Sequence, residues 1–165
     1  MFKINGLVNT VSFLLFIFIL NVFAFAGTGT WNKVNEDDWH DPANWDGLAV
    51  EPADGDNTRI NNGGTALITG AAVVDNVRLG TLDGQSGQIK ISGGGASLTS
   101  DSSIFFVGDY GDGILLVENG GSLILNGDFS YLDVAKYEDS DGRVTVTGIG
   151  SIIKTSNTAI GGRNT

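Results

Sequence analysis

The amino-acid sequence predicts an all-β protein folded as a right-handed parallel β-helix, a solenoid in which short strands stack coil upon coil. Three observations support this fold class. Short apolar runs alternate with polar residues at a period of two, as strands require. The 165 residues include 25 glycines but only 2 prolines, and the glycines punctuate these runs as turns do. The third observation is an internal repeat of nearly constant length.

Three consecutive units, which begin at Leu79, Val107 and Val134, make up most of the second half of the chain. Their anchor positions, spaced 28, 27 and 26 residues apart, are Gly80, Gly108, Ala135 and Gly161. Each unit contains three apolar runs of strand length, and glycines separate the runs. One unit cannot bury its inward side chains alone, so neighbouring units must stack and share a core.

The alternation within each run assigns one set of side chains to the interior of the stack. The predicted inward residues are Ile89, Ile91, Leu98, Ile114, Leu116, Leu123, Leu125, Val144, Val146 and Ile152. Stacked coils lie ~4.8 Å apart, so the segment after residue 26 would form roughly five coils and a stub about 25 Å long. A β-sandwich is the alternative fold, because short strands with turn signals serve both architectures.

The first 26 residues have the features of an export signal. Lys3 precedes the apolar run Val11–Leu20, and Ala24-Phe25-Ala26 forms a small-x-small site that predicts cleavage after Ala26. The apolar run is shorter than the roughly 20 residues that cross a bilayer, and Asn21 interrupts it. We therefore expect a secreted or cell-surface protein without a transmembrane segment in its mature part.

The charge balance disfavours two classes of partner. The formal net charge is −10, and it is one unit more negative without Lys3. Nucleic acids and anionic membrane surfaces require clustered Lys and Arg, and the chain has no basic run. It has no cysteine either, so the stability of the exported protein must come from packing and hydrogen bonds rather than from disulfides.

Two segments carry a resemblance to a protein family. The segment Gly142–Ser151, followed after a short polar stretch by Ile-Gly-Gly, resembles the repeats of exported bacterial β-helix proteins, both autotransporter passengers and surface proteins with sorting signals. The N-terminal Trp39-His-Asp-Pro-Ala-Asn-Trp45 resembles how such solenoids begin. Two departures are Ala135 at an anchor glycine and Ile153 at a position that is often aromatic. The resemblance implies an adhesin or surface-layer role, with surface glycans or proteins of host or neighbouring cells as partners.

Three segments follow from these patterns: a signal peptide at 1–26, a Trp-rich N-terminal cap at 27–65 and β-helix repeats at 66–165. The strands of the first coil are predicted at Ala66–Thr69 and Ala72–Val77. The last residues, 160–165, begin a fourth unit, which predicts an N-terminal fragment of a longer protein. An uncovered solenoid end would favour edge-to-edge self-association.

The three tryptophans, Trp31, Trp39 and Trp45, all fall within the predicted cap, beside the only histidine, His40. Large indoles can bury apolar area over the first coil, so a lid on the core is the preferred interpretation. Exposed indoles would instead offer flat faces for stacking on glycans, and this remains the functional alternative. The tyrosines Tyr110, Tyr131 and Tyr137 are not expected at equivalent positions of the repeat.

Few residues suggest a metal or catalytic site. His40 with Asp37, Asp38 and Asp41 lacks a second imidazole, and adjacent loop acids are usually turn formers. Two equivalent corners carry weak candidates for a Ca²⁺ site, a cation that prefers oxygen ligands. These candidates are Asp109, Asp112, Asp139 and Asp141.

No Gly-x-Ser-x-Gly elbow is present, and Ser92 and Ser151 belong to repeat turns. The predicted outward residues contain no pair of acids in register: Lys90, Ser92, Thr99, Glu118, Asn126, Arg143, Thr145 and Lys154. The sequence therefore predicts a non-catalytic structural or adhesin-like solenoid without a cofactor. The alternative is a β-helix that binds or degrades polysaccharides.

Overall fold

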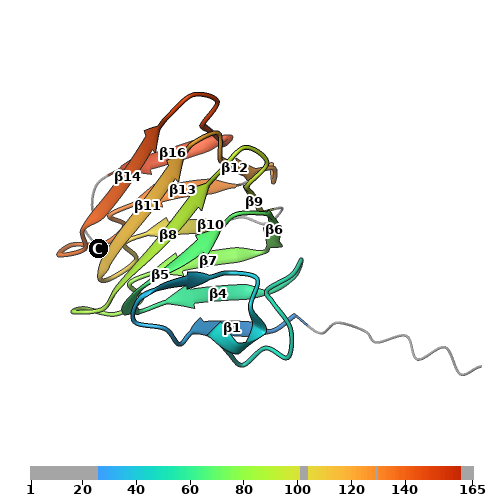
Figure 1. Ribbon diagram of the computed structural model, residues 1–165. Coiled ribbons are helices and arrows are strands. Elements are labelled where there is room, and N and C mark those ends of the chain that lie inside the picture. The colour runs from blue at the N-terminus through green and yellow to red at the C-terminus, as the bar shows by residue number, and fades with distance from the viewer. Residues whose placement is uncertain (1–25, 101–103, 129, 161–165) are drawn as a thin grey trace, which may run out of the picture.

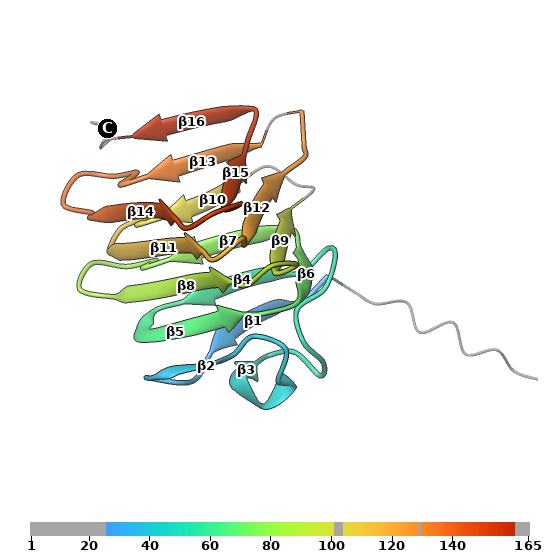
Figure 2. The same ribbon diagram turned by 45° about the horizontal axis from the view of Figure 1, so that its top comes forward.

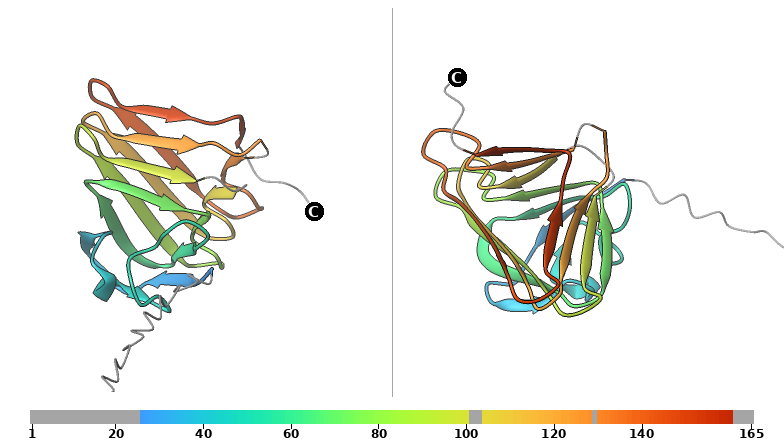
Figure 3. Two further views of the ribbon diagram at one scale, coloured as in Figure 1. Left: turned by 90° about the vertical axis from the view of Figure 1, so that its right-hand side faces the viewer. Right: turned by 90° about the horizontal axis from the view of Figure 1, so that it is seen from above.

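The fold is a parallel β-solenoid. The computed structural model describes residues 26–100, 104–128 and 130–160, and three parallel sheets run along the stack (Figure 1). Sheet A has the strand order β16-β13-β10-β7-β4-β1-β3, sheet B has β14-β11-β8-β5-β2, and sheet C has β15-β12-β9-β6. Viewed from above, the sheets form the three sides of a triangle (Figure 3).

Successive coils contribute one strand to each sheet, except that the first coil, among the described residues, has no strand in sheet C and that β3 is an additional antiparallel strand beside β1 in sheet A. The strands of sheet A are β1 (Thr28–Trp31), β3 (Trp45–Asp46), β4 (Asn57–Ile60), β7 (Asn76–Leu79), β10 (Ile104–Val107), β13 (Tyr131–Val134) and β16 (Asn157–Ile160). Those of sheet B are β2 (Glu36–Asp38), β5 (Asn62–Ile68), β8 (Ser86–Ser92), β11 (Asp112–Glu118) and β14 (Gly142–Thr147). Those of sheet C are β6 (Ala71–Val74), β9 (Ser97–Ser100), β12 (Ser122–Leu125) and β15 (Ile152–Lys154).

The pairing register confirms the repeat length that the anchors predict. Val77 pairs with Phe105, Phe105 with Leu132, and Leu132 with Thr158, so successive coils are offset by 28, 27 and 26 residues. The chain passes from sheet B to sheet C and then to sheet A in a right-handed path as the coils rise (Figure 3). The β-sandwich alternative is wrong: among the described residues the only antiparallel pairing joins β1 to β3.

The stack begins before the predicted first coil at residue 66. β1 pairs in parallel with β4, and β2 pairs in parallel with β5, so residues 28–31 and 36–38 already belong to the sheets. The chain between β2 and β4 leaves the stack and forms a short 3-10 helix at Pro42–Asn44, β3 and a loop. This excursion lies at the N-terminal end of the stack, beneath β1 and β5 (Figure 2). The sequence does not show the repeat there because Thr58 and Val77, which are register partners, are only 19 residues apart.

The alternation places most predicted inward residues correctly. Ile89, Ile91, Leu98, Leu123 and Leu125 are buried in one continuous core, and Val144 packs against it. Val146 is the register partner of the buried Val117 and so faces inward, but it is 46% exposed in the last coil.

Three predictions of inward residues are wrong. Ile114 and Leu116 face outward, and their neighbours Leu115 and Val117 fill the core; likewise Ile153, not Ile152, packs against the core. Where several apolar residues follow one another, the sequence predicts a strand but does not show which of them face inward. A shift of one residue moves every side chain to the other face.

Stacked glycines form the sharp corner between sheets A and B. Gly113 pairs with Gly87 on one side and with Gly142 on the other. A Cβ at Gly87, Gly113 or Gly142 would lie within 2.0–2.4 Å of a backbone atom of the preceding strand or turn. Only glycine permits this close approach, which explains why a glycine opens the first run of each repeat.

Ala135, which stands where the other repeats have an anchor glycine, adopts the same backbone conformation as those glycines. Gly80 and Gly108 adopt positive φ angles of 63° and 81°, and Ala135 adopts φ 53° at the equivalent position. Its N–H donates to the Val107 carbonyl oxygen at 2.9 Å, as the Gly80 N–H does to Ile60 at 3.1 Å. The repeat therefore keeps its turn at the cost of left-handed strain in one alanine. Gly161 lies outside the described residues.

Candidate functional site

The tryptophan cluster covers the N-terminal end of the core. Trp31, Trp39 and Trp45 are all buried members of the core cluster, and Trp45 makes edge-to-face contacts with the other two at centroid distances of 5.0 and 4.7 Å. The Trp45 Nε1–H donates to the Trp39 carbonyl oxygen at 2.8 Å. This arrangement agrees with a lid. Stacking on a glycan would require exposed indole faces, and these three have none.

The acids around His40 satisfy the backbone of the cap. Asp38 accepts the N–H of His40, and Asp41 accepts that of Ala43 at the start of the 3-10 helix. The Nδ1 atom of His40 contacts a carboxylate oxygen of Glu51. These contacts are those of turn-forming residues.

The four calcium candidates do not form one cluster. Asp109 is buried and pairs with Arg78 and Lys136, at 3.1 and 3.2 Å. Asp112 and Asp141 line a different depression, of about 290 Å³ at the corner of sheet B, but Arg143 lines it too, and its positive charge opposes a cation. Among the described residues no group of three or more His, Cys, Asp and Glu side chains is placed to hold a metal ion.

The structure brings together a set of aromatic residues on the outer face of sheet A. Tyr110 and Tyr137 follow the anchors Gly108 and Ala135 by two residues each, and their rings stack at 4.0 Å with an interplanar angle of 16°. Their equivalence contradicts the expectation from sequence. Counting from the anchor positions, rather than from the strands, would have revealed it.

An ion-pair network centred on the buried Asp109 lies beside this stack. The Asp109 carboxylate receives Arg78 on one oxygen and Lys136 on the other, so one residue joins β7 to the two turns that follow β10 and β13. The Lys136 Nζ also lies 3.8 Å from the Phe106 ring centroid and 4.3 Å from that of Tyr137. Cation–π contacts of this kind hold a charged side chain against an aromatic surface.

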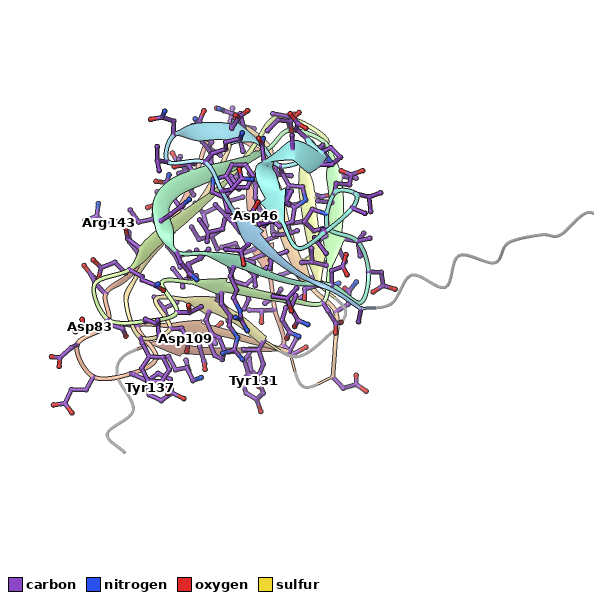
Figure 4. All side chains as sticks on the ribbon, turned by 90° about the horizontal axis from the view of Figure 1, so that it is seen from below. Asp46, Asp83, Asp109, Tyr131, Tyr137 and Arg143 are labelled. Carbon is purple, nitrogen blue, oxygen red and sulfur yellow. The ribbon has the colours of Figure 1, made fainter. Side chains whose placement is uncertain are left out.

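An open depression of about 460 Å³ adjoins the network. Its lining residues come from β10, β13 and the following turn: Ile104, Phe106, Tyr131, Asp133, Lys136 and Tyr137. Tyr131 is 38% exposed. Seen from below, Tyr131 and Tyr137 project from the same side of the solenoid, with Asp109 near them (Figure 4). We call these six residues together with Tyr110 the tyrosine face.

The neighbours of the two stacked phenols move their pKa values in opposite directions. Hydrogen bonding with Lys136, and then with Tyr110, lowers the pKa of Tyr137. Hydrogen bonding with Tyr137, followed by partial burial, raises the pKa of Tyr110. Lys136 thus acts on Tyr137 both through its ring and through its phenol.

Comparison with protein-family models, with curated proteins and with solved structures yields no match. In the part of the chain that the structure describes, no helix has the length and apolar character to span a bilayer.

Proposed function

We propose that the protein is an exported structural solenoid that works outside the cell or at its surface, presents an adhesive face and performs no catalysis. Its partners would be surface glycans or proteins of host or neighbouring cells. The export signal expected at 1–26 and the resemblance of Gly142–Ser151 to surface β-helix repeats support this proposal.

The observation that carries the proposal is the in-register stack. Parallel pairing places the same outward position of successive coils side by side, as for Ile104 and Tyr131 or Tyr110 and Tyr137. A rigid shaft with repeated outward chemistry suits display and multivalent contact, since adjacent sites act at high effective concentration.

The alternative of a polysaccharide-degrading solenoid has less support. Glycoside hydrolysis generally needs two carboxyl groups flanking one bond. On sheet B, Lys90 lies between Glu36 and Glu118 at 3.4 and 3.5 Å, so these two acids share an ion-pair network. Asp37 accepts the N–H of Asp38. Binding of carbohydrate without turnover fits these contacts better.

Localisation tests the proposal directly. Antibodies against residues 27–160 should detect the protein in the medium, or on intact cells in a form that added protease removes. A pool that resists protease until the cells are lysed would contradict export to the surface.

A further inference from the structure

We propose that the tyrosine face binds a neutral saccharide. This proposal names the class of ligand for the adhesive function and therefore rests on that function. The depression of about 460 Å³ falls within the usual range of small-ligand sites, ~300–1,000 Å³. Four of its six lining residues are aromatic or aliphatic and two are charged, so it combines apolar surface with a few polar groups as such sites do.

The chemistry of the lining matches that of a sugar ring. Tyr131, 38% exposed, offers a flat face against which the C–H face of a pyranose can pack, and Tyr137, whose ring contacts Tyr110 and Lys136, lines the depression beside it. Asp133, which is 5% exposed, and Lys136 also line the depression. A carboxylate accepts and an ammonium donates, so the pair can serve hydroxyl groups, which do both.

The local charge favours a neutral ligand. Arg78 and Lys136 are balanced by Asp109 and Asp133, so the site attracts neither sign strongly. The excess of acids over bases in the whole chain opposes an anionic polysaccharide. A cation would meet Lys136 in the lining.

Lys136 and Tyr137 are positioned before any ligand arrives. Lys136 is held by Asp109 and by the Phe106 ring, and Tyr137 is held by its stack on Tyr110. Side chains that are already ordered lose less conformational entropy on binding.

Affinity electrophoresis would test this site with the full chain and with soluble xyloglucan, galactomannan, β-glucan and starch, and with polygalacturonate as the anionic comparison. We expect at least one neutral polymer to retard the protein. Tyr131→Ala and Tyr137→Ala should reduce retardation at least about tenfold, as the loss of about 1.4 kcal/mol would. Tyr131→Phe, which keeps the ring, should retain most of it. Ile114→Ala, on the exposed face of sheet B, is the matched control.

Two outcomes overturn the proposal: no retardation by any neutral polymer, or retardation that Tyr131→Ala and Tyr137→Ala leave unchanged. Circular dichroism and the Ile114→Ala control distinguish a lost site from a lost fold. If the electrophoresis shows no binding but the protein is found at the cell surface, the saccharide site alone is refuted. A cytoplasmic location would refute the adhesive function itself.

A second, independent observation concerns the N-terminus, and it rests on the proposed export. The backbone nitrogen of Gly27 lies 2.7 Å from Oδ1 of Asp56, whose other oxygen accepts the Ala53 N–H at 3.0 Å. Asp56 is buried and makes no ion pair among the described residues. We infer that cleavage after Ala26 turns this contact into an ion pair between the new α-ammonium of Gly27 and Asp56.

The surroundings of Gly27 fit this role. A Cβ at this position would lie 2.6 Å from Leu48 Cδ2 and 3.2 Å from Asp56 Oδ1, so the contact favours glycine. The Gly27 carbonyl oxygen accepts the Asn57 N–H at 2.9 Å, which fixes the first residue against β4. Removal of the signal peptide would thus attach the new N-terminus at Gly27 to the loop that contains Asp56.

Comparison of two chains tests the ion pair: one that begins at Gly27 and one that begins at Ala26. The chain beginning at Gly27 should have a thermal midpoint about 3 °C higher, roughly what one interaction gives a domain of this size. Asp56→Asn should abolish the difference. Equal midpoints, a difference that persists in Asp56→Asn, or an exported protein whose mass shows another N-terminus would each overturn the inference.

Discussion

The two ends of the stack bury their apolar residues to different extents. At the N-terminal end, Trp31 of β1 together with Trp39 and Trp45 of the non-repetitive excursion covers the core, and all three are themselves buried. In the last described coil, Val146 faces inward but is 46% exposed, although its register partner Val117 is fully buried. The comparison shows that a coil of this solenoid does not bury its own interior, and that burial comes from whatever lies above and below it.

The largest expected effect is at the covered end. Trp39→Ala removes a fully buried indole, and we expect a loss of about 3–5 kcal/mol in the free energy of unfolding. Urea denaturation measures it. Val34→Ala, at a side chain 69% exposed in the same region, should change stability by less than about 0.5 kcal/mol. Similar losses for both would mean that the tryptophans do not form a lid.

A glycine at the corner should be nearly as sensitive. The Cβ of Gly113→Ala would lie 2.1 Å from the Gly108 nitrogen, so the backbone must move, and we expect a loss of about 3 kcal/mol. Gly94→Ala is the control, because nothing lies within 4 Å of its Cβ position. If thermal unfolding shows equal midpoints for the two variants, the close approach of the strands is not required.

A matched pair of valines tests the comparison between coils directly. Val117→Ala should cost about 2 kcal/mol, because it removes two fully buried carbons and leaves a cavity. The same change at its register partner, Val146→Ala, should cost about 0.5 kcal/mol or less. Equal costs by chemical denaturation would indicate that the last coil is covered in solution.

The smallest effect concerns the tyrosine face. Because Lys136 lowers the pKa of Tyr137, Lys136→Met should raise that pKa toward the ordinary value for tyrosine. The ultraviolet absorbance of phenolate during a pH titration reports the change, with Tyr137→Phe to assign the signal. Lys90→Met on sheet B is the control. An unchanged titration would show that Lys136 does not act on the Tyr137 phenol.

The repeat and the fold class were predictable because glycine spacing and two-residue alternation both follow from backbone geometry. The phase of a run such as Ile114–Val117 was not, since four consecutive apolar residues fit either face equally well. Buried polar contacts could not be predicted from the sequence either. Asp109 appeared as a corner acid, and only the fold brings Arg78 and Lys136 to it.

The corner between sheets A and B has a consequence for how such a protein can vary. Its connections differ widely in length: Asn61 alone joins β4 to β5, residues 80–85 join β7 to β8, and residues 135–141 join β13 to β14. Strands β8, β11 and β14 keep their register despite this variation, whereas β5 shifts its register against β8 between Asn62 and Thr65. Insertions at Glu138 or Asp139, both exposed, would therefore lengthen a projecting loop and leave the shaft intact, which makes this corner a natural position to graft a foreign epitope.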